Sequence, residues 1–119
     1  MAQLKQLTSL EQWKESLEGS SRKPLLVFKH STSCSVSAGA HEETLRYIED
    51  DKTGEVDYAI VHVIEDRPVS NEIAENLDVK HASPQVILVK DGRQEWNESH
   101  WRITYDFLSG KLGSSTEKA

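Results

Sequence analysis

A three-layer α/β/α sandwich with a central mixed sheet of four or five strands is the fold that this sequence predicts. Apolar runs of strand length alternate with amphipathic segments of helix length through most of the chain. Because parallel strands need a long connection, this alternation favours right-handed βαβ units. An Asp91-Gly92 pair then follows the last apolar run, and this dipeptide is typical of a tight antiparallel hairpin.

The first segments predict a helix preceded by a short strand near residues 3–7. Residues 8–11 (TSLE) have the form of a capping box, in which the hydroxyl caps N–H groups and the carboxylate reaches back. Leu10, Trp13 and Leu17 then repeat at helical spacing, so we expect all three side chains to face inward.

The apolar run at residues 25–28 (LLVF) predicts a buried strand. The amphipathic segment that follows, residues 35–51, predicts a second helix, and residues 52–54 (KTG) its C-terminal stop. The side chains expected to face the core are Val36, Ala40, Leu45 and Ile48.

Residues 58–64 are rich in Val and Ile and predict another buried strand. Residues 65–68 (EDRP) break the pattern, after which Ser70 is expected to cap a short helix. The inward face of that helix is expected to consist of Ile73, Ala74 and Leu77.

The run at residues 86–89 predicts a strand that pairs across the Asp91-Gly92 turn with residues 94–98. A last helix is expected over residues 104–112, with its buried face formed by Tyr105, Leu108 and Leu112. Residues 1–112 are thus expected to form a single domain, and residues 113–119 a flexible tail.

Composition narrows the classes of partner and compartment. The net charge of −6 argues against nucleic acid or an anionic membrane as the main partner. No apolar run approaches the roughly 20 residues that span a bilayer, and the first residues lack the apolar core of a signal peptide. One cysteine cannot form an internal disulfide and suits a reducing compartment, so we expect a cytoplasmic protein.

Cys34 is the candidate nucleophile. It lies between the predicted strand at residues 25–28 and the predicted helix at residues 35–51, where unpaired N–H groups converge and the helix dipole favours negative charge. The thiolate is the reactive form of cysteine. Free cysteines are often simply buried, but the neighbours here are Ser, Thr and His, which favours a redox role.

Lys29, His30 and Thr32 are the residues expected to tune the thiolate. Strand alternation puts Lys29 and His30 on opposite faces, so at most one of them is expected to act directly. A hydrogen bond from a strand-end residue to the backbone is the alternative interpretation.

The other histidines and the tryptophans do not indicate a site. His62 lies in an apolar strand and is interpreted as a core residue. The remaining histidines show no metal-like spacing with one another or with Cys34, and we expect no structural zinc. Trp13, Trp96 and Trp101 are interpreted as packing residues and not as a binding platform.

The element order, a cysteine at the first strand–helix junction and Pro84 just before the third core strand resemble the thioredoxin superfamily. Residues 28–37 (FKHSTSCSVS) further resemble the signature of the monothiol bacilliredoxins, which typically contains Lys-His-Ser-Thr-Thr-Cys-Pro-Ile-Ser. Ser33 and Ser35 depart from that signature, where Thr and Pro are usual. Losing the proline restores a backbone N–H but leaves the nucleophile in place.

The resemblance implies reduction of mixed disulfides between protein cysteines and the low-molecular-weight thiol bacillithiol. Cys34 would attack the bacillithiol sulfur, and bacillithiol or another redoxin would regenerate it. Ser37 occupies the place of the resolving cysteine of dithiol relatives; it could hydrogen-bond a thiolate but cannot resolve a disulfide.

The same resemblance implies a substrate site and a set of partners. Ser33, Ser35, Ser83 and the cis-proline Pro84 would contact the substrate, which could pair with the backbone at Ser83 as an added strand. S-bacillithiolated proteins would be the partners, with bacillithiol as co-substrate and no tightly bound cofactor.

Two other functions stay open at this level. A non-catalytic adapter of the same fold would bind extended peptides without using the thiol. A monothiol glutaredoxin-like iron–sulfur carrier is less well supported, because such proteins use Cys-Gly-Phe-Ser and this chain has Cys-Ser-Val-Ser.

Overall fold

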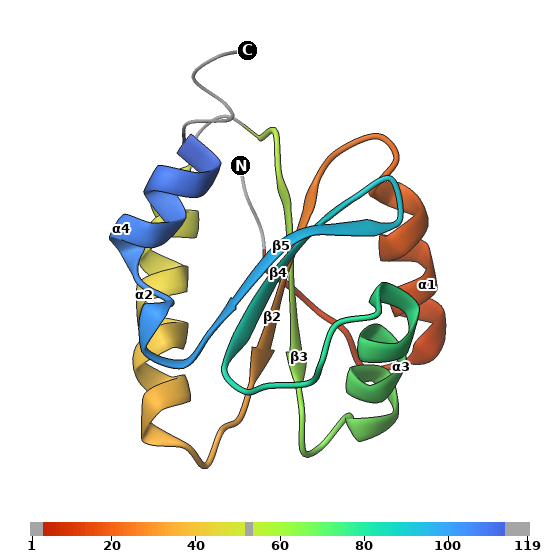
Figure 1. Cartoon of the computed structure of the whole chain (residues 1–119), viewed down its shortest axis with the longest axis horizontal. Helices are drawn as coiled ribbons and strands as arrows, with labels where there is room; N and C mark the ends of the chain where they lie inside the picture. Colours follow the sequence, from red (N-terminus) through yellow and green to blue (C-terminus); the bar gives the residue numbers. More distant parts are fainter. Residues whose placement is uncertain (1–3, 52–53, 114–119) are drawn as a thin grey trace.

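The computed structural model describes residues 4–51 and 54–113. It contains a five-stranded mixed sheet with helices on both faces (Figure 1). The elements are β1 (Leu4–Gln6), α1 (Leu10–Gly19), β2 (Leu25–His30), α2 (Ser35–Asp50), β3 (Asp57–His62), α3 (Arg67–Leu77), β4 (Gln85–Lys90), β5 (Arg93–Ser99), the 3-10 turn η1 (His100–Arg102), α4 (Tyr105–Leu108) and the π-helical turn η2 (Ser109–Gly113). The predicted fold class is therefore confirmed.

The strand order is β1-β3-β2-β4-β5. β1 and β2 pair parallel with β3, through connections that contain α1 and α2. β4 pairs antiparallel with both β2 and β5. Asp91 (φ 53°) and Gly92 (φ 75°) both adopt the left-handed conformation that a tight hairpin turn requires.

All six side chains of β2 are buried, because this strand lies between two others and is covered on both faces. Its alternation divides the core: Leu25 and Val27 pack on the side of α1 and α3, while Leu26 and Phe28 pack on the side of α2 and α4. Figure 1 shows these helix pairs on opposite sides of the sheet.

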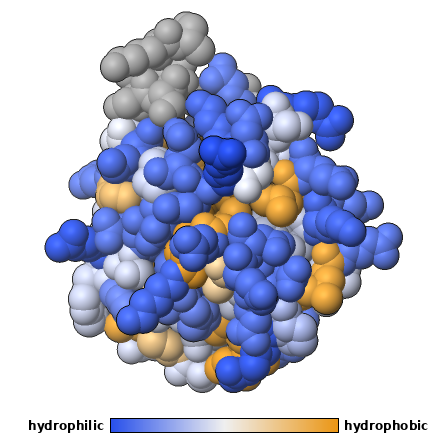
Figure 2. All heavy atoms as spheres, turned by 45° about the vertical axis from the view of Figure 1, so that its right-hand side comes forward, coloured by the Kyte–Doolittle hydropathy of each residue, from blue (hydrophilic) through white to orange (hydrophobic). Residues whose placement is uncertain are grey.

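The first capping box lies one residue later than predicted. Ser9 is the N-cap of α1 and accepts the Gln12 N–H at 3.2 Å, while Gln12 Oε1 accepts the Thr8 N–H at 2.7 Å. The shift turns Leu10 out of the core, where it is 50% exposed, and leaves Trp13 buried. Figure 2, turned so that the α1–α3 side comes forward, shows mostly hydrophilic atoms with small separate apolar areas.

The predicted inward face of α2 is partly wrong. Val36 and Leu45 are only half-buried, and the buried side chains of the helix are Ser37, Ala40, Thr44 and Ile48. Two hydroxyls therefore lie on the core side, where each finds a hydrogen-bond partner. Of the predicted helix stop, residues 52–53 lie outside the described part of the chain.

Boundaries nearer the C-terminus also differ from the prediction. α3 begins at Arg67, with Pro68 in its first turn, where the missing N–H breaks no helical bond. Ser70 is therefore a buried residue inside the helix and not its cap. The turn η1 was not predicted, and residues 114–119 of the predicted tail lie outside the described residues.

Among the residues described, no helix is long and apolar enough to cross a membrane.

We expect Ile87→Ala to lower the free energy of unfolding by about 2–5 kcal/mol, because its fully buried side chain on β4 would leave a cavity. Urea unfolding measures this change. Leu10→Ala, at an exposed position of α1, is the control and should cost less than about 0.5 kcal/mol. Equal losses in both variants would contradict the assignment of Ile87 to the core.

Candidate active site

Cys34 is the N-cap residue of α2, in the loop that leaves β2. Its backbone is extended (φ −109°, ψ 126°), its carbonyl accepts the Ala38 N–H at 3.0 Å, and its own N–H donates to the Ser31 carbonyl at 3.2 Å. The residue is half-buried, and its side chain makes no capping hydrogen bond. A thiolate at this point lies at the positive end of a sixteen-residue helix.

Ser37 closes the loop that carries Cys34. Its fully buried Oγ accepts the Ser31 N–H at 2.9 Å and lies 2.7 Å from His30 Nδ1. One hydroxyl thus joins the end of β2, the loop and the first turn of α2. Within the described residues it makes no hydrogen bond to Cys34, so its predicted role toward the thiol stays a prediction.

His30 belongs to a cluster of aromatic rings beneath this loop. Its ring lies 4.4 Å from that of His41 and 5.8 Å from that of His62, measured between centroids, and stacks on Phe28 at 5.5 Å. Burial, reinforced by His41 and His62, lowers the pKa of His30 to about 4, while Glu65 acts in the opposite sense. His30 is therefore neutral at pH 7 and acts here as a hydrogen-bonding group and not as a cation.

Lys29 lies on the other face of β2, as alternation requires. It is fully buried, and its Nζ lies 3.2 Å from His81 Nδ1, in the segment that leads to Pro84. Burial lowers the pKa of Lys29 to about 8. Gln85, its register partner on β4, donates to the Lys80 carbonyl at 3.1 Å. These contacts hold the segment before β4 against the sheet.

Pro84 reaches the same edge of the sheet from β4. The Ser83–Pro84 peptide bond is cis, and the Pro84 carbonyl accepts the His100 N–H at 3.0 Å. Because Lys29 pairs antiparallel with Gln85, Ser83 and Pro84 run beside the end of β2 and the loop that follows it. The structure thus brings these two predicted residues to the strand end from which the Cys34 loop departs.

The remaining predicted residues surround the thiol on the surface. Thr32 Oγ1 donates to Glu65 Oε2 at 3.3 Å, which ties the loop to the segment after β3. Ser33 and Ser35 flank Cys34 and are exposed. In the described part of the chain, no group of three or more His, Cys, Asp or Glu side chains is arranged to hold a metal ion.

One neighbouring residue lies in a different environment from the one that the sequence predicts. Trp101 was interpreted as a packing residue, but its side chain is 79% exposed. It lines a hollow of about 350 Å³ together with Ser35 and Val36, the two residues after Cys34. Only the hairpin strand β5 and the η1 turn bring it there, and no local sequence signal marks that approach.

We expect the protein to lose stability as the pH falls from 7 toward 4. The unfolded chain takes up a proton on His30 near its ordinary pKa of about 6.5, whereas the folded chain resists until about 4, so acid favours unfolding in this interval. Urea unfolding at pH 7 and pH 5 measures the loss. His30→Phe should show a smaller difference between the two pH values; an unchanged difference would exclude His30 as a contributor.

Comparisons with known proteins agree with this geometry. Residues 5–108 match the model of the family described as monothiol bacilliredoxin BrxC. A solved protein described as a proposed oxidoreductase with a thioredoxin fold is 28% identical, with a TM-score of 0.80, 92% of this chain and 93% of that chain covered.

Two thioredoxins show the same fold at lower identity. A poplar thioredoxin h mutant is 19% identical, with a TM-score of 0.76 and coverage of 99% and 86% of the two chains. Fasciola hepatica thioredoxin is 14% identical, with a TM-score of 0.73 and coverage of 92% and 97%. With a family match over most of its length and a single cysteine at the start of α2, the chain belongs to the monothiol bacilliredoxin family of thiol-disulfide oxidoreductases.

Proposed function

We propose that this protein reduces mixed disulfides between client proteins and bacillithiol, with Cys34 as the only nucleophile. The observation that carries the proposal is the position of Cys34, half-buried at the N-terminus of α2 in a loop held by Ser37. The membership of the bacilliredoxin family supports bacillithiol as the small thiol. The lone thiol supports a reducing compartment, and we propose the cytoplasm.

The reaction proceeds by thiol–disulfide exchange. The Cys34 thiolate attacks the bacillithiol sulfur, the bond between the two substrate sulfurs breaks, and the client cysteine leaves as a thiolate that takes up a proton. Cys34 is then bonded to bacillithiol. A second thiol, from free bacillithiol or another redoxin, attacks this disulfide and supplies the electron pair that restores Cys34.

The regeneration step must come from outside the chain. There is one cysteine in the sequence, and the buried hydroxyl of Ser37 is engaged with Ser31 and His30. The backbone at Ser83 runs beside the end of β2 and the Cys34 loop, which supports a site where an extended client segment pairs as an added strand. Ser33 and Ser35, exposed beside the thiol, would contact the same substrate.

We expect Cys34→Ser to abolish release of bacillithiol from a bacillithiolated client, because a hydroxyl is not ionised near neutral pH and cannot take the place of the thiolate. Mass spectrometry of the client follows the release. Pro24→Ala, just before the end of β2 that lies opposite the Cys34 loop, is the control and should retain activity. Undiminished release by Cys34→Ser would reject the proposed function.

We expect Ser37→Ala to lower the free energy of unfolding by about 1–3 kcal/mol, because the Ser31 N–H and His30 lose a buried partner. Release of bacillithiol should also slow, since the loop that carries Cys34 is no longer closed. Ser35→Ala, at an exposed position, should leave stability within about 0.5 kcal/mol of the unmodified protein. Wild-type stability of Ser37→Ala would show that its hydroxyl does not hold the loop.

A further inference from the structure

The exposed indole of Trp101 lines a hollow that also includes Ser35, the residue after Cys34. Trp101 belongs to η1, and the hollow that it lines continues along the first turns of α2 through Val36 and Gly39. α2 itself begins directly after Cys34. An isolated exposed apolar residue is ordinary, but this one stands at the rim of a hollow next to the nucleophile.

Backbone contacts fix the position of the η1 turn. The His100 N–H bonds to the Pro84 carbonyl at 3.0 Å, which ties the turn to the segment proposed to receive the client. His100 has φ 58°, a left-handed conformation that is unfavourable for a residue with a side chain. The fold therefore holds this turn in a conformation that the local sequence does not favour.

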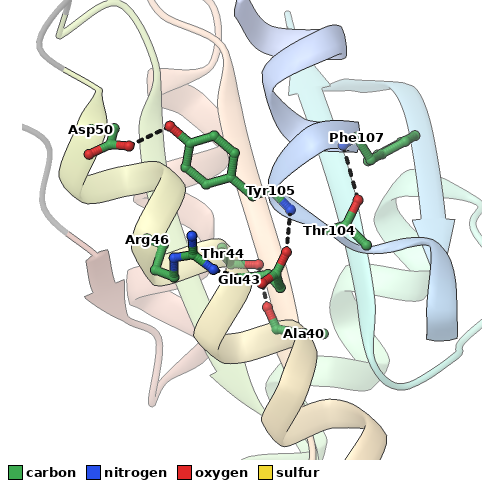
Figure 3. Close-up of polar contacts among 8 residues, drawn as sticks. All are labelled: Ala40, Glu43, Thr44, Arg46, Asp50, Thr104, Tyr105 and Phe107. Atoms are coloured by element: carbon green, nitrogen blue, oxygen red, sulfur yellow. Dashed lines mark hydrogen bonds and ion pairs between the residues drawn. The ribbon is translucent and has the colours of Figure 1, made fainter.

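Side-chain contacts on α2 hold the other end of the turn (Figure 3). Thr104 caps α4 by accepting the Phe107 N–H at 3.1 Å, and Glu43 Oε1 accepts the Tyr105 N–H at 2.8 Å. The Tyr105 hydroxyl donates to Asp50. Because both ends of η1 are held, the backbone of Trp101 has a fixed place, which lowers the cost of ordering this turn when a ligand binds.

The hollow beside Trp101 has an acidic wall. Glu42 and Glu43 line its wall, and Glu43 is engaged by Arg46 at 3.2 Å and by the Tyr105 N–H. Glu42 is exposed, and the whole chain carries a net charge of −6. A positively charged segment complements this wall, whereas an acidic segment is repelled.

We propose that Trp101 and the hollow beside it bind an apolar side chain of a client polypeptide whose modified cysteine is flanked by basic residues. The hollow includes Ser35, the residue after Cys34, and His100, whose N–H bonds to the Pro84 carbonyl, so an extended chain could reach from the hollow to both segments, which a small thiol alone does not require. The proposal rests on the proposed function, since it names the class of client for the same thiol. Trp101 acts as a specificity residue.

The test uses single-cysteine peptides activated as mixed disulfides with thionitrobenzoate. The Cys34 thiolate attacks the peptide sulfur, the mixed disulfide breaks, and the coloured thionitrobenzoate anion leaves. One peptide carries Leu and Lys beside its cysteine, a second carries Ser and Lys, and a third carries Leu and Glu. The symmetrical disulfide of thionitrobenzoate serves as a substrate without a polypeptide.

The Leu–Lys peptide should react fastest, and Trp101→Ala should slow it about tenfold, the loss typical of a central aromatic contact. The same variant should leave the symmetrical disulfide unaffected, and Trp101→Phe should restore most of the rate. Leu10→Ala, which removes an exposed apolar side chain from the far side of the sheet, should change nothing. Equal slowing of peptide and symmetrical disulfide would overturn the proposal and assign the hollow to the small thiol; no slowing would also overturn it.

Failure of this proposal and failure of the proposed function are distinguishable. The peptide exchange needs only the Cys34 thiol and contains no bacillithiol. Peptide discrimination without release from a bacillithiolated client would reject the proposed function alone. Release from the client without any effect of Trp101→Ala on the peptides would reject this proposal alone.

Discussion

The site depends on the pair of hydrogen bonds at Ser37. A chain that leaves a buried strand and enters a helix within four residues has backbone N–H groups that neither element satisfies. Ser37 Oγ takes one of them, that of Ser31, and bonds to the ring of His30 at the end of β2. Cys34 is thereby held at the helix start without using its own side chain for capping, which leaves the sulfur for chemistry.

Lys29 and His30, the two basic residues at the end of β2, contact different segments of the chain. His30 is buried in a stack with Phe28 and His41, and its neutral ring supports the loop through Ser37. Lys29 is buried beneath the other face of the sheet and contacts His81, before Pro84. The two residues thus support the two segments that meet at the thiol, one from each face of β2.

Hydrogen bonds to other parts of the chain also hold the segment that carries Trp101. The Pro84 carbonyl, Glu43 and Asp50 each accept a hydrogen bond from the η1 and α4 region. These acceptors come from two parts of the chain far apart in the sequence, the segment before β4 and α2. The backbone that carries Trp101 is consequently held beside the first turn of α2 by contacts of the neighbouring residues.

Local sequence signals were sufficient for the fold and for the position of the single cysteine between a strand and a helix. The alternation of apolar runs and amphipathic segments, the Asp91-Gly92 turn and the single cysteine between a strand and a helix depend on neighbours a few residues away, so they can be recognised in the chain alone. The inward position of Ser37 and Thr44 could not be recognised in this way, because periodicity favours Val36 and Leu45 as the core side chains and takes no account of buried hydrogen bonds. The sequence alone also does not predict the neutral state of His30, the burial of Lys29 against His81 or the exposure of Trp101. Each of these is set by side chains from other elements, and only tertiary packing decides which of them meet.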